Sequence, residues 1–408
     1  MRKKSCCIAS AFFILCLAAT DASENFQYKH QAGDRYRVLS TIYQDIFINN
    51  RLSHRAEILN RIAVEVTDET EGRGMHRAVF QTSERAQRAE GVIVPGAGMS
   101  FHWSREYESE FERDRLGRMT IDSRFFMPVV RDVPVFPGRS IEPGETWTYE
   151  GHEVHDFRDN FGITEPYRIP FTADYEYLGE RQWEGKMYPA FSVSYRIRSQ
   201  PPAVRGRIWP RNIIGASDQT VFWDSDMGQP VAYTEEYRYI FELSNGNTVE
   251  YRGTAQAEII ESVRMDRQTL ADEIAEEIQR LDIADVTVRV VDEGITISLD
   301  DIQFQADTAI MLPGEREKLD MIVDILLRYQ AHDILVGGHT ALAGTEEGRM
   351  RLSQERAGVV ADYLIARNAR SPQRVVVRGY GAHRPLAGND TEEGRRRNRR
   401  VEITLLEN

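Results

Sequence analysis

The segment His152-Glu153-Val154-His155 places two potential metal ligands three residues apart. On a strand, residues three apart point to opposite faces, so this spacing favours structural or exposed histidines over a metal site. The chain has no phosphate-cradling glycine loop, no Gly-x-Ser-x-Gly elbow and no dinucleotide fingerprint. We therefore predict no catalytic residues, no metal and no cofactor, and we expect that the protein is not an enzyme.

A run of arginines between Gly394 and Arg400 has the charge to bind phosphate or another anionic polymer. The whole chain of 408 residues is acidic, however, with 51 Lys and Arg against 64 Asp and Glu and a net charge of −13. That balance opposes bulk electrostatic binding to nucleic acid. We expect these arginines to cap and pair structurally, and we predict no nucleic-acid partner.

Alternating apolar and polar residues dominate positions 23–265. Tyr36, Val38 and Ile42 share one face of an expected strand, and Phe101, Trp103, Tyr107 and Phe111 alternate with charged residues. Residues 239–253 form an expected hairpin with a type I′ turn at Asn245-Gly246. The pattern predicts antiparallel sheet with one solvated face.

The period changes near residue 265. Residues 266–283 carry apolar side chains at helical spacing, which predicts a linker helix. In residues 284–408 strands alternate with helices, which predicts a compact α/β domain. The whole chain is therefore an α+β multidomain protein: a β-rich region at 23–265, a linker helix at 266–283 and an α/β domain at 284–408. A further division of the β-rich region near residues 133–150, where Pro and Gly cluster, is left open.

Five ordered segments of the last domain resemble the OmpA-like peptidoglycan-binding family. The segments, with Phe304 and Asp307 upstream, are Gly338-His339-Thr340, Leu352-Ser353-x-x-Arg356-Ala357, Gly379-Tyr380-Gly381, Asn389-x-Thr391-x-x-Gly394-Arg395 and Asn398-Arg399-Arg400-Val401-Glu402-Ile403. The resemblance implies a mixed sheet with helices on one face. It also implies a pocket for the diamino acid of the peptidoglycan stem peptide.

The implied pocket departs from the family pattern at two positions. Arg356 matches the family's arginine, but Ala341 stands at the family's aspartate and Arg349 at its asparagine. Loss of the carboxylate that pairs with a ligand ammonium costs about tenfold or more in affinity. We therefore expect weak or lost peptidoglycan binding. The pocket positions implied by the resemblance are Thr340, Ala341, Arg349, Leu352 and Arg356, with Glu346 and Glu347 as candidate substitute anions.

The first 22 residues read as a signal peptide. Arg2-Lys3-Lys4 precedes a short apolar run, and all three cysteines, Cys6, Cys7 and Cys16, lie there. We expect an exported chain, periplasmic and open to association with the outer membrane, whose mature form lacks cysteine. No small residue stands just before Cys16, which disfavours lipidation.

Several functions remain open at this stage. The preferred hypothesis is a non-enzymatic structural or scaffolding protein of the periplasm. The alternatives are a working peptidoglycan tether and a carrier in which the β-rich region encloses a lipid or small ligand. A transmembrane barrel is disfavoured because polar residues interrupt the candidate lipid-facing stripes. The partner of the β-rich region is not specified by its residues.

Overall fold

The computed structural model describes residues 23–88, 101–261, 267–291, 293–300, 302, 304–305, 308–330 and 332–406. The predicted signal peptide with its three cysteines lies outside the described residues, as does Asp307. Among the helices that are described, none combines the length and hydrophobicity needed to cross a membrane.

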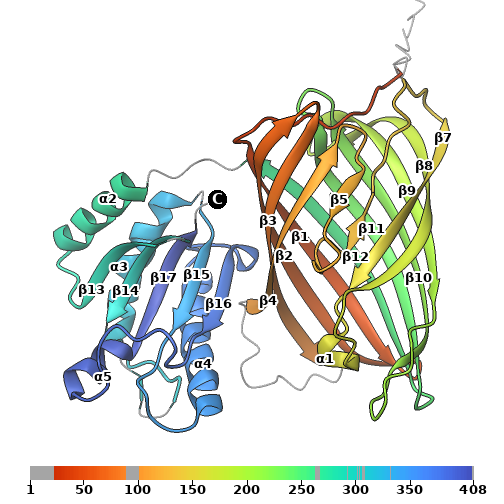
Figure 1. The fold of residues 1–408 in the computed structure, drawn as a ribbon. Coiled ribbons are helices and arrows are strands. Elements are labelled where there is room, and N and C mark those ends of the chain that lie inside the picture. Colours follow the sequence, from red (N-terminus) through yellow and green to blue (C-terminus); the bar gives the residue numbers. More distant parts are fainter. Residues whose placement is uncertain are drawn as a thin grey trace, which may run out of the picture.

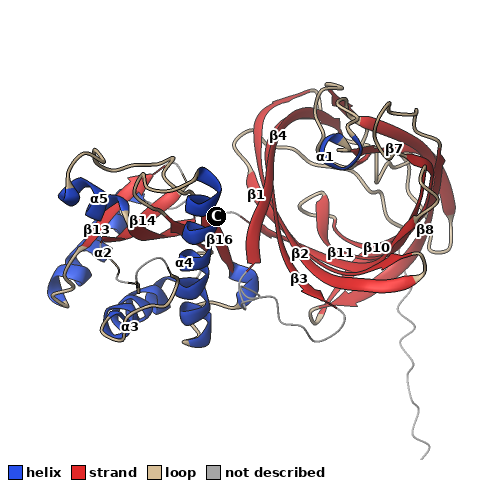
Figure 2. Cartoon of the chain, turned by 90° about the horizontal axis from the view of Figure 1, so that it is seen from below, coloured by secondary structure: helices blue, strands red, loops and turns tan. Residues whose placement is uncertain are grey.

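Up to residue 261, twelve described strands form one antiparallel sheet that curls round on itself (Figures 1 and 2). We call it the curled sheet. β1 pairs with both β2 and β12, and the order is β5-β4-β3-β2-β1-β12-β11-β10-β9-β8-β7-β6. The short helix α1 (Arg158–Phe161) lies at one end. The strands are β1 (Arg35–Ile48), β2 (Arg51–Thr70), β3 (Arg73–Arg88), β4 (Phe101–Asp114), β5 (Met119–Ile121), β6 (Val130–Arg131), β7 (Thr146–His155), β8 (Tyr167–Trp183), β9 (Lys186–Ser199), β10 (Pro210–Asp224), β11 (Gln229–Leu243) and β12 (Thr248–Glu261).

Side-chain alternation gives the curled sheet an apolar inner face. Ile169, Phe171, Ala173 and Tyr175 of β8 are buried inside, whereas the residues that alternate with them are exposed. Successive residues of a strand point to opposite faces, so the two-residue period seen in the sequence becomes an inside and an outside. Part of the interior is a dense aromatic core, which confirms the expected packing role for two of the tryptophans. This core includes Phe26, Phe136, Trp147, Tyr177, Phe191 and Trp223.

The outer face of the curled sheet carries charged residues. On β4 the glutamates 106, 108 and 110 are exposed, and Glu110 pairs with Arg77 of β3 at 3.2 Å. Glu112 pairs with Arg73 at 2.9 Å. The outer face of these two strands is therefore charged, in contrast to the apolar inner face.

A β-bulge corrects the predicted face of Phe101. The register between β3 and β4 shifts between Thr82 and Ser83, where β4 contains one residue more than β3. Tyr107 and Phe111 face inward as expected, but Phe101 lies on the outer face, where the Arg85 guanidinium stands 4.9 Å above its ring. The alternation rule failed because one extra residue inverts the facing of everything beyond it.

The predicted hairpin between β11 and β12 is present, but its turn is of another type. A type I′ turn needs positive φ at both central residues, whereas of Asn245 and Gly246 only Gly246 has it, at 86°. Gly246 N donates to Leu243 O at 3.0 Å, and Leu243 N to Asn247 O at 2.8 Å. These bonds describe a longer loop in which the glycine takes the left-handed position.

The C-terminal α/β domain has a five-stranded mixed sheet of order β13-β14-β17-β15-β16. Only β15 and β16 run parallel. The implied mixed sheet with helices on one face is confirmed. Its elements are α2 (Arg267–Arg280), β13 (Val286–Val291), β14 (Gly294–Asp300), α3 (Glu315–Leu326), η1 (Leu327–Tyr329), β15 (Ile334–Gly338), α4 (Glu346–Ala366), η2 (Pro372–Arg374), β16 (Val375–Gly379), α5 (Glu392–Asn398) and β17 (Arg400–Leu406).

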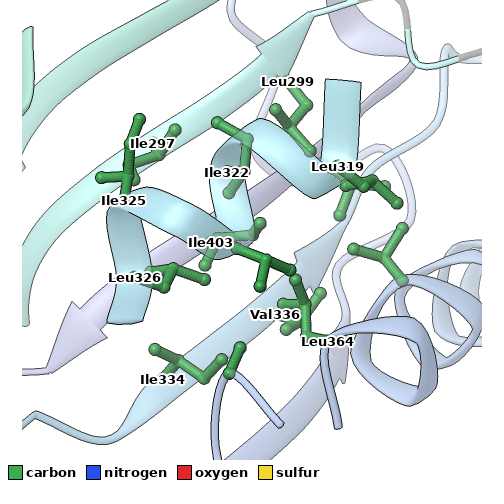
Figure 3. Packing of buried hydrophobic residues seen from close by; sticks show 14 of the residues in the cluster. Ile297, Leu299, Leu319, Ile322, Ile325, Leu326, Ile334, Val336, Leu364 and Ile403 are labelled. Atoms are coloured by element: carbon green, nitrogen blue, oxygen red, sulfur yellow. The ribbon is translucent and has the colours of Figure 1, made fainter. Parts of the chain in front are cut away.

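One apolar core joins the helices to this sheet (Figure 3). Leu319 and Ile322 of α3 and Leu364 of α4 pack over Ile297 of β14 and Val336 of β15. The residues of α2 that have helical spacing, among them Ile274 and Ile278, belong to the same core. Helix α2 therefore packs on the C-terminal domain and lies within the interval predicted for a linker.

The C-terminal domain contacts the outer face of the curled sheet. β16 pairs in parallel with β4 through Val376 and Phe101 and through Val377 and His102. The Asp333 carboxylate forms ion pairs with Arg37 of β1, at 3.3 Å, and with Arg61 of β2, at 3.2 Å. Arg374, which ends η2 of the same domain as Asp333, completes the cluster at 2.8 Å.

Candidate functional site

The implied pocket is built where β15 ends and α4 begins. Thr345 caps the helix, accepting a hydrogen bond from Gly348 N at 3.1 Å. The helix approaches the strand so closely that a Cβ on Gly338 would lie 2.0 Å from Ser353 O. Glycine is therefore required at Gly338, which explains the first residue of the Gly-His-Thr segment. This close approach places the loop of residues 339–345 against the first turns of α4.

Thr340 and Ala341 lie buried in that loop. Thr340 N donates to Gly381 O at 2.8 Å, which ties the loop to the one after β16. The Thr340 hydroxyl is buried without a hydrogen-bond partner among the described residues. Ala341 presents only a methyl group at the position where the resemblance implies a carboxylate. The loop is thus held in place, and the loss of an ammonium-binding anion there stays a prediction.

Arg349 lies against the same loop. Its Nη1 donates to Gly344 O at 2.6 Å, three residues after Ala341. Its Nε is buried without a hydrogen-bond partner in the described part of the chain. The structure therefore brings Arg349 to the loop that carries Ala341, as the alignment of motifs implied. A positive charge here repels a ligand ammonium.

Arg356 is engaged by the chain itself. Its Nε donates to Thr308 O at 3.0 Å, and its guanidinium stands 5.0 Å from the centre of the Phe304 ring. Leu352, one turn earlier on α4, is half-buried. The residue that matches the family's arginine thus also holds the segment around Phe304 and Thr308.

The candidate substitute anions lie in the exposed first turn of α4. Glu346 pairs with His383 at 3.2 Å, and both side chains are exposed. Glu347 is exposed as well. Their positions place negative charge at the helix N-terminus, where the helix dipole favours it. Their use as ligand-binding groups stays a prediction.

A buried ion cluster beneath the loop was missed from the sequence. His339 is stacked on Tyr380 and its Nε2 lies 3.2 Å from the Glu402 carboxylate, which also receives Arg400 Nε at 2.7 Å. Burial opposes ionisation of Glu402, but His339 and Arg400 outweigh it, so the pKa of Glu402 lies well below its usual value. All four residues belong to the quoted segments: Arg400 and Glu402 alternate on β17, whereas His339 and Tyr380 directly follow β15 and β16. The cluster fixes the strand end from which the pocket loop leaves.

The arginine run pairs within the fold, as expected. Arg395 and Arg399 reach Glu392 at 2.9 and 2.8 Å, and Arg396 reaches Glu393 at 3.1 Å. Asn398 supports the pocket from the same helix, because its Nδ2 donates to Asn389 Oδ1 at 3.1 Å and that oxygen accepts Leu342 N.

The two histidines of β7 take separate partners. His152 Nδ1 lies 3.5 Å from Asp132, and His155 Nε2 lies 2.8 Å from Glu153. Within the described ranges no group of three or more side chains is arranged to hold a metal ion.

The interior of the curled sheet contains a cavity that sequence reasoning did not locate. It has a volume of about 750 Å³ and is lined mainly by aromatic and aliphatic side chains, among them Ile42, Phe157 and Tyr251. Glu153 is buried in its wall and accepts hydrogen bonds from Tyr195 OH, at 2.9 Å, and Tyr239 OH. The alternation identified an inner face, but only closure of the sheet leaves this face unfilled.

The comparisons with known proteins concern the C-terminal domain. Residues 303–399 match the model of the OmpA family. These residues form an OmpA-family domain. No family model matches the N-terminal region.

Several relatives of the OmpA-family domain have names that refer to the outer membrane or to peptidoglycan. Outer membrane protein A of Bordetella avium is 37% identical over 106 residues, which cover 26% of this chain and 54% of that protein. The peptidoglycan-binding protein ArfA of Mycobacterium tuberculosis is 38% identical over 104 residues, which cover 26% of this chain and 32% of that protein. A solved structure, the cell wall anchor of the T6SS from Pseudomonas aeruginosa, is 30% identical and covers 35% of this chain and 100% of that chain, with a TM-score of 0.30. The chain spans about a third to a half of the length of the curated relatives it matches.

Proposed function

We propose that this chain is a non-enzymatic scaffolding protein of the periplasm whose OmpA-family domain binds diaminopimelate-type peptidoglycan weakly or not at all. The observation that carries the proposal is the pocket loop, where Ala341 replaces the carboxylate and Arg349 bonds to Gly344 O at 2.6 Å. Both changes disfavour an ammonium group at the same place. The names of the relatives support an envelope location and a descent from wall-binding domains.

A sacculus pull-down with purified full-length mature chain tests this proposal. We expect the wild type to stay in the supernatant, and the double variant Ala341→Asp, Arg349→Asn to gain about tenfold or more in affinity because a charge-assisted bond is restored. The matched control is Leu342→Asp, Arg351→Asn, which makes the same charge change at two exposed neighbouring positions. This control should remain unbound. Tight wild-type binding that free diaminopimelate competes away would overturn the proposal in favour of a working tether.

A second function, that of a carrier, is favoured by the cavity in the curled sheet. Ligand pockets typically have about 300–1,000 Å³ and mostly apolar walls with a few polar groups. The cavity of about 750 Å³, with Glu153 and its tyrosines in the wall, fits that description. The carrier function belongs to the β-rich region and is compatible with scaffolding by the OmpA-family domain.

Binding of the neutral apolar dye N-phenyl-1-naphthylamine tests the carrier function. We expect saturable fluorescence enhancement at one site per chain. Ile42→Trp, on the inner face of β1, fills the cavity and should abolish the enhancement. Thr41→Trp adds the same side chain to the outer face of the same strand and should leave the fluorescence enhancement unchanged. If the wild type and both variants enhanced the dye fluorescence equally, a binding site inside the sheet would be refuted.

A further inference from the structure

A smaller space of about 270 Å³ adjoins the cavity of the curled sheet. The two share wall residues, including Ile62, Phe80, Tyr233 and Glu235, so they lie side by side along the inner face. The smaller space differs in charge, because Arg113, His30 and His76 line it together with apolar side chains.

Within the part of the chain that the structure describes, Arg113 forms no ion pair with a carboxylate. Its guanidinium stands 4.8 Å from the centre of the Tyr28 ring and 5.5 Å from that of Phe111. Among the described residues, no carboxylate lies within 4 Å of it, and its buried Nε has no hydrogen-bond partner. Stacking between aromatic faces holds the planar group in position while leaving its edge available for hydrogen bonds.

Two imidazoles beside Arg113 also have unused nitrogens. The His30 and His76 rings are 5.0 Å apart, and the absence of a side chain on Gly74 gives His30 its room, since a Cβ there would lie 2.6 Å from the ring. His76 is only 2% exposed, and its Nδ1 has no hydrogen-bond partner among the described residues. His30 Nε2 is likewise buried without one. A buried polar atom left without a partner costs stability, so these nitrogens would gain from a ligand's hydrogen-bonding groups.

Burial and the nearby Arg113 lower the pKa of both imidazoles, that of His76 to about 3. Both rings are therefore neutral at pH 7, and each carries one N–H. Lys29 and the exposed Asp34 stand at the rim of this space, and Glu235 lies deeper. Burial, its largest influence, raises the pKa of Glu235, which favours its neutral form. The carboxylates of Glu69 and Asp114 act on His30 from nearby, and Arg113 is the cation that lines this space beside the two imidazoles.

We propose that the curled sheet binds an anionic amphiphile, with its headgroup at Arg113 and its apolar tail in the cavity of about 750 Å³. This inference rests on the proposed carrier function and adds the class of ligand. A carboxylate or phosphate accepts hydrogen bonds from the Arg113 guanidinium in a planar fork. Neutral imidazole N–H groups add uncharged donors. The tail contacts the inner faces of β1, β2 and β11, where Ile42, Ile62 and Phe241 line the wall.

Calorimetric titration of the full chain with four 12-carbon probes tests the proposal: dodecanoate, dodecyl phosphate, dodecylamine and 1-dodecanol. We expect at least one of the two anions to bind about tenfold or more tightly than the amine and the alcohol. The two anions distinguish a fatty acid from a phosphate headgroup. Arg113→Gln should remove the anion preference and leave dodecanol affinity unchanged. The control Arg115→Gln removes an exposed arginine two residues further on and should retain the preference.

A spectroscopic readout keeps the test valid if Arg113→Gln is poorly folded. An anion bound at Arg113 stabilises protonated imidazole, so the NMR titration of His76 in the wild type should move to higher pH with dodecyl phosphate, which stays anionic at the low pH where His76 titrates, and stay in place with dodecanol. Failure of all four probes to bind would overturn the carrier function itself. Binding of alcohol or amine as tightly as the anions would preserve the carrier and overturn the anionic assignment.

Discussion

At the scale of single residues, Arg356 is a predicted binding residue that also contacts its own chain. It stands where the resemblance implies a carboxylate-binding arginine, yet its Nε already donates to Thr308 O. The Phe304 ring lies against the same guanidinium. A loss of peptidoglycan binding on removing Arg356 could therefore come from a lost ligand contact or from a less stable domain. Stability must be measured together with binding.

We predict that Arg356→Ala lowers the unfolding free energy by about 1–2 kcal/mol without any ligand, through the lost hydrogen bond and the lost cation–π contact. Urea denaturation followed by circular dichroism measures this. Arg351→Ala, on the same helix but largely exposed and 3.8 Å from Glu355, should change stability by less than about 0.5 kcal/mol. Equal stability of the two variants would show that Arg356 has no structural part.

At the scale of elements, the contact of β15 with α4 decides the geometry of the pocket. Gly338, at the end of β15, lets the backbone of Ser353 in α4 come close. Gly379, at the end of β16, does the same for the backbone of Gln354. Ser353 Oγ in turn accepts Gly381 N at 2.9 Å, which joins the helix to the loop after β16. The glycines of the motif therefore serve close packing, and the binding residues are placed as a consequence.

Two glycine-to-alanine variants should change stability in opposite directions. Gly338→Ala forces a Cβ to within 2.0 Å of Ser353 O, so we predict a loss of about 1–3 kcal/mol as the helix shifts. Gly358→Ala, in the interior of α4, meets nothing within 4 Å and should stabilise by about 0.5–1 kcal/mol through helix propensity. Thermal unfolding of both variants checks the pair. A stable Gly338→Ala protein would contradict the close approach.

At the scale of the whole molecule, Asp333 links the OmpA-family domain to the curled sheet. It is 4% exposed, and it contacts Arg37 and Arg61 from one part and Arg374 from the other. Burial opposes its ionisation, but Arg61, Arg37 and Arg374 outweigh burial and hold the pKa of Asp333 below its usual value. The contribution of this carboxylate to stability is therefore complete above its unfolded pKa of about 4 and is lost as the pH falls through the folded value.

We predict that Asp333→Asn lowers the unfolding free energy by roughly 3 kcal/mol at pH 7, because three arginines then face an uncharged group. The difference from wild type should begin to shrink below about pH 4, where the carboxylate of the unfolded chain becomes protonated, and should disappear once the pH falls below the lower pKa of the folded state. Denaturation at a series of pH values measures this. Asp320→Asn is the control, since its pair with Arg367 is exposed. A difference that persists unchanged at low pH would refute the electrostatic explanation.

The residue pattern predicted most of the local structure. Alternation gave the antiparallel strands and the inner face, helical spacing gave α2, and the motif segments gave the OmpA-family domain with the positions of Ala341, Arg349 and Arg356. These features depend on neighbours in the chain, which is why they can be read from it. The errors were local too: one bulge inverted Phe101, and the turn at Asn245-Gly246 took another form.

The sequence by itself determined the two kinds of domain and the missing carboxylate in the pocket, because motif spacing and residue identity are properties of the chain. Only the tertiary structure decided that β1 closes against β12, leaving a cavity, and that Arg113, His30 and His76 meet at its end. Arg113 lies more than 80 residues from His30, so no local period relates them. The same is true of Asp333, whose partners Arg37 and Arg61 come from the far end of the chain. Such contacts depend on strand register and sheet closure, which are set by packing over the whole fold.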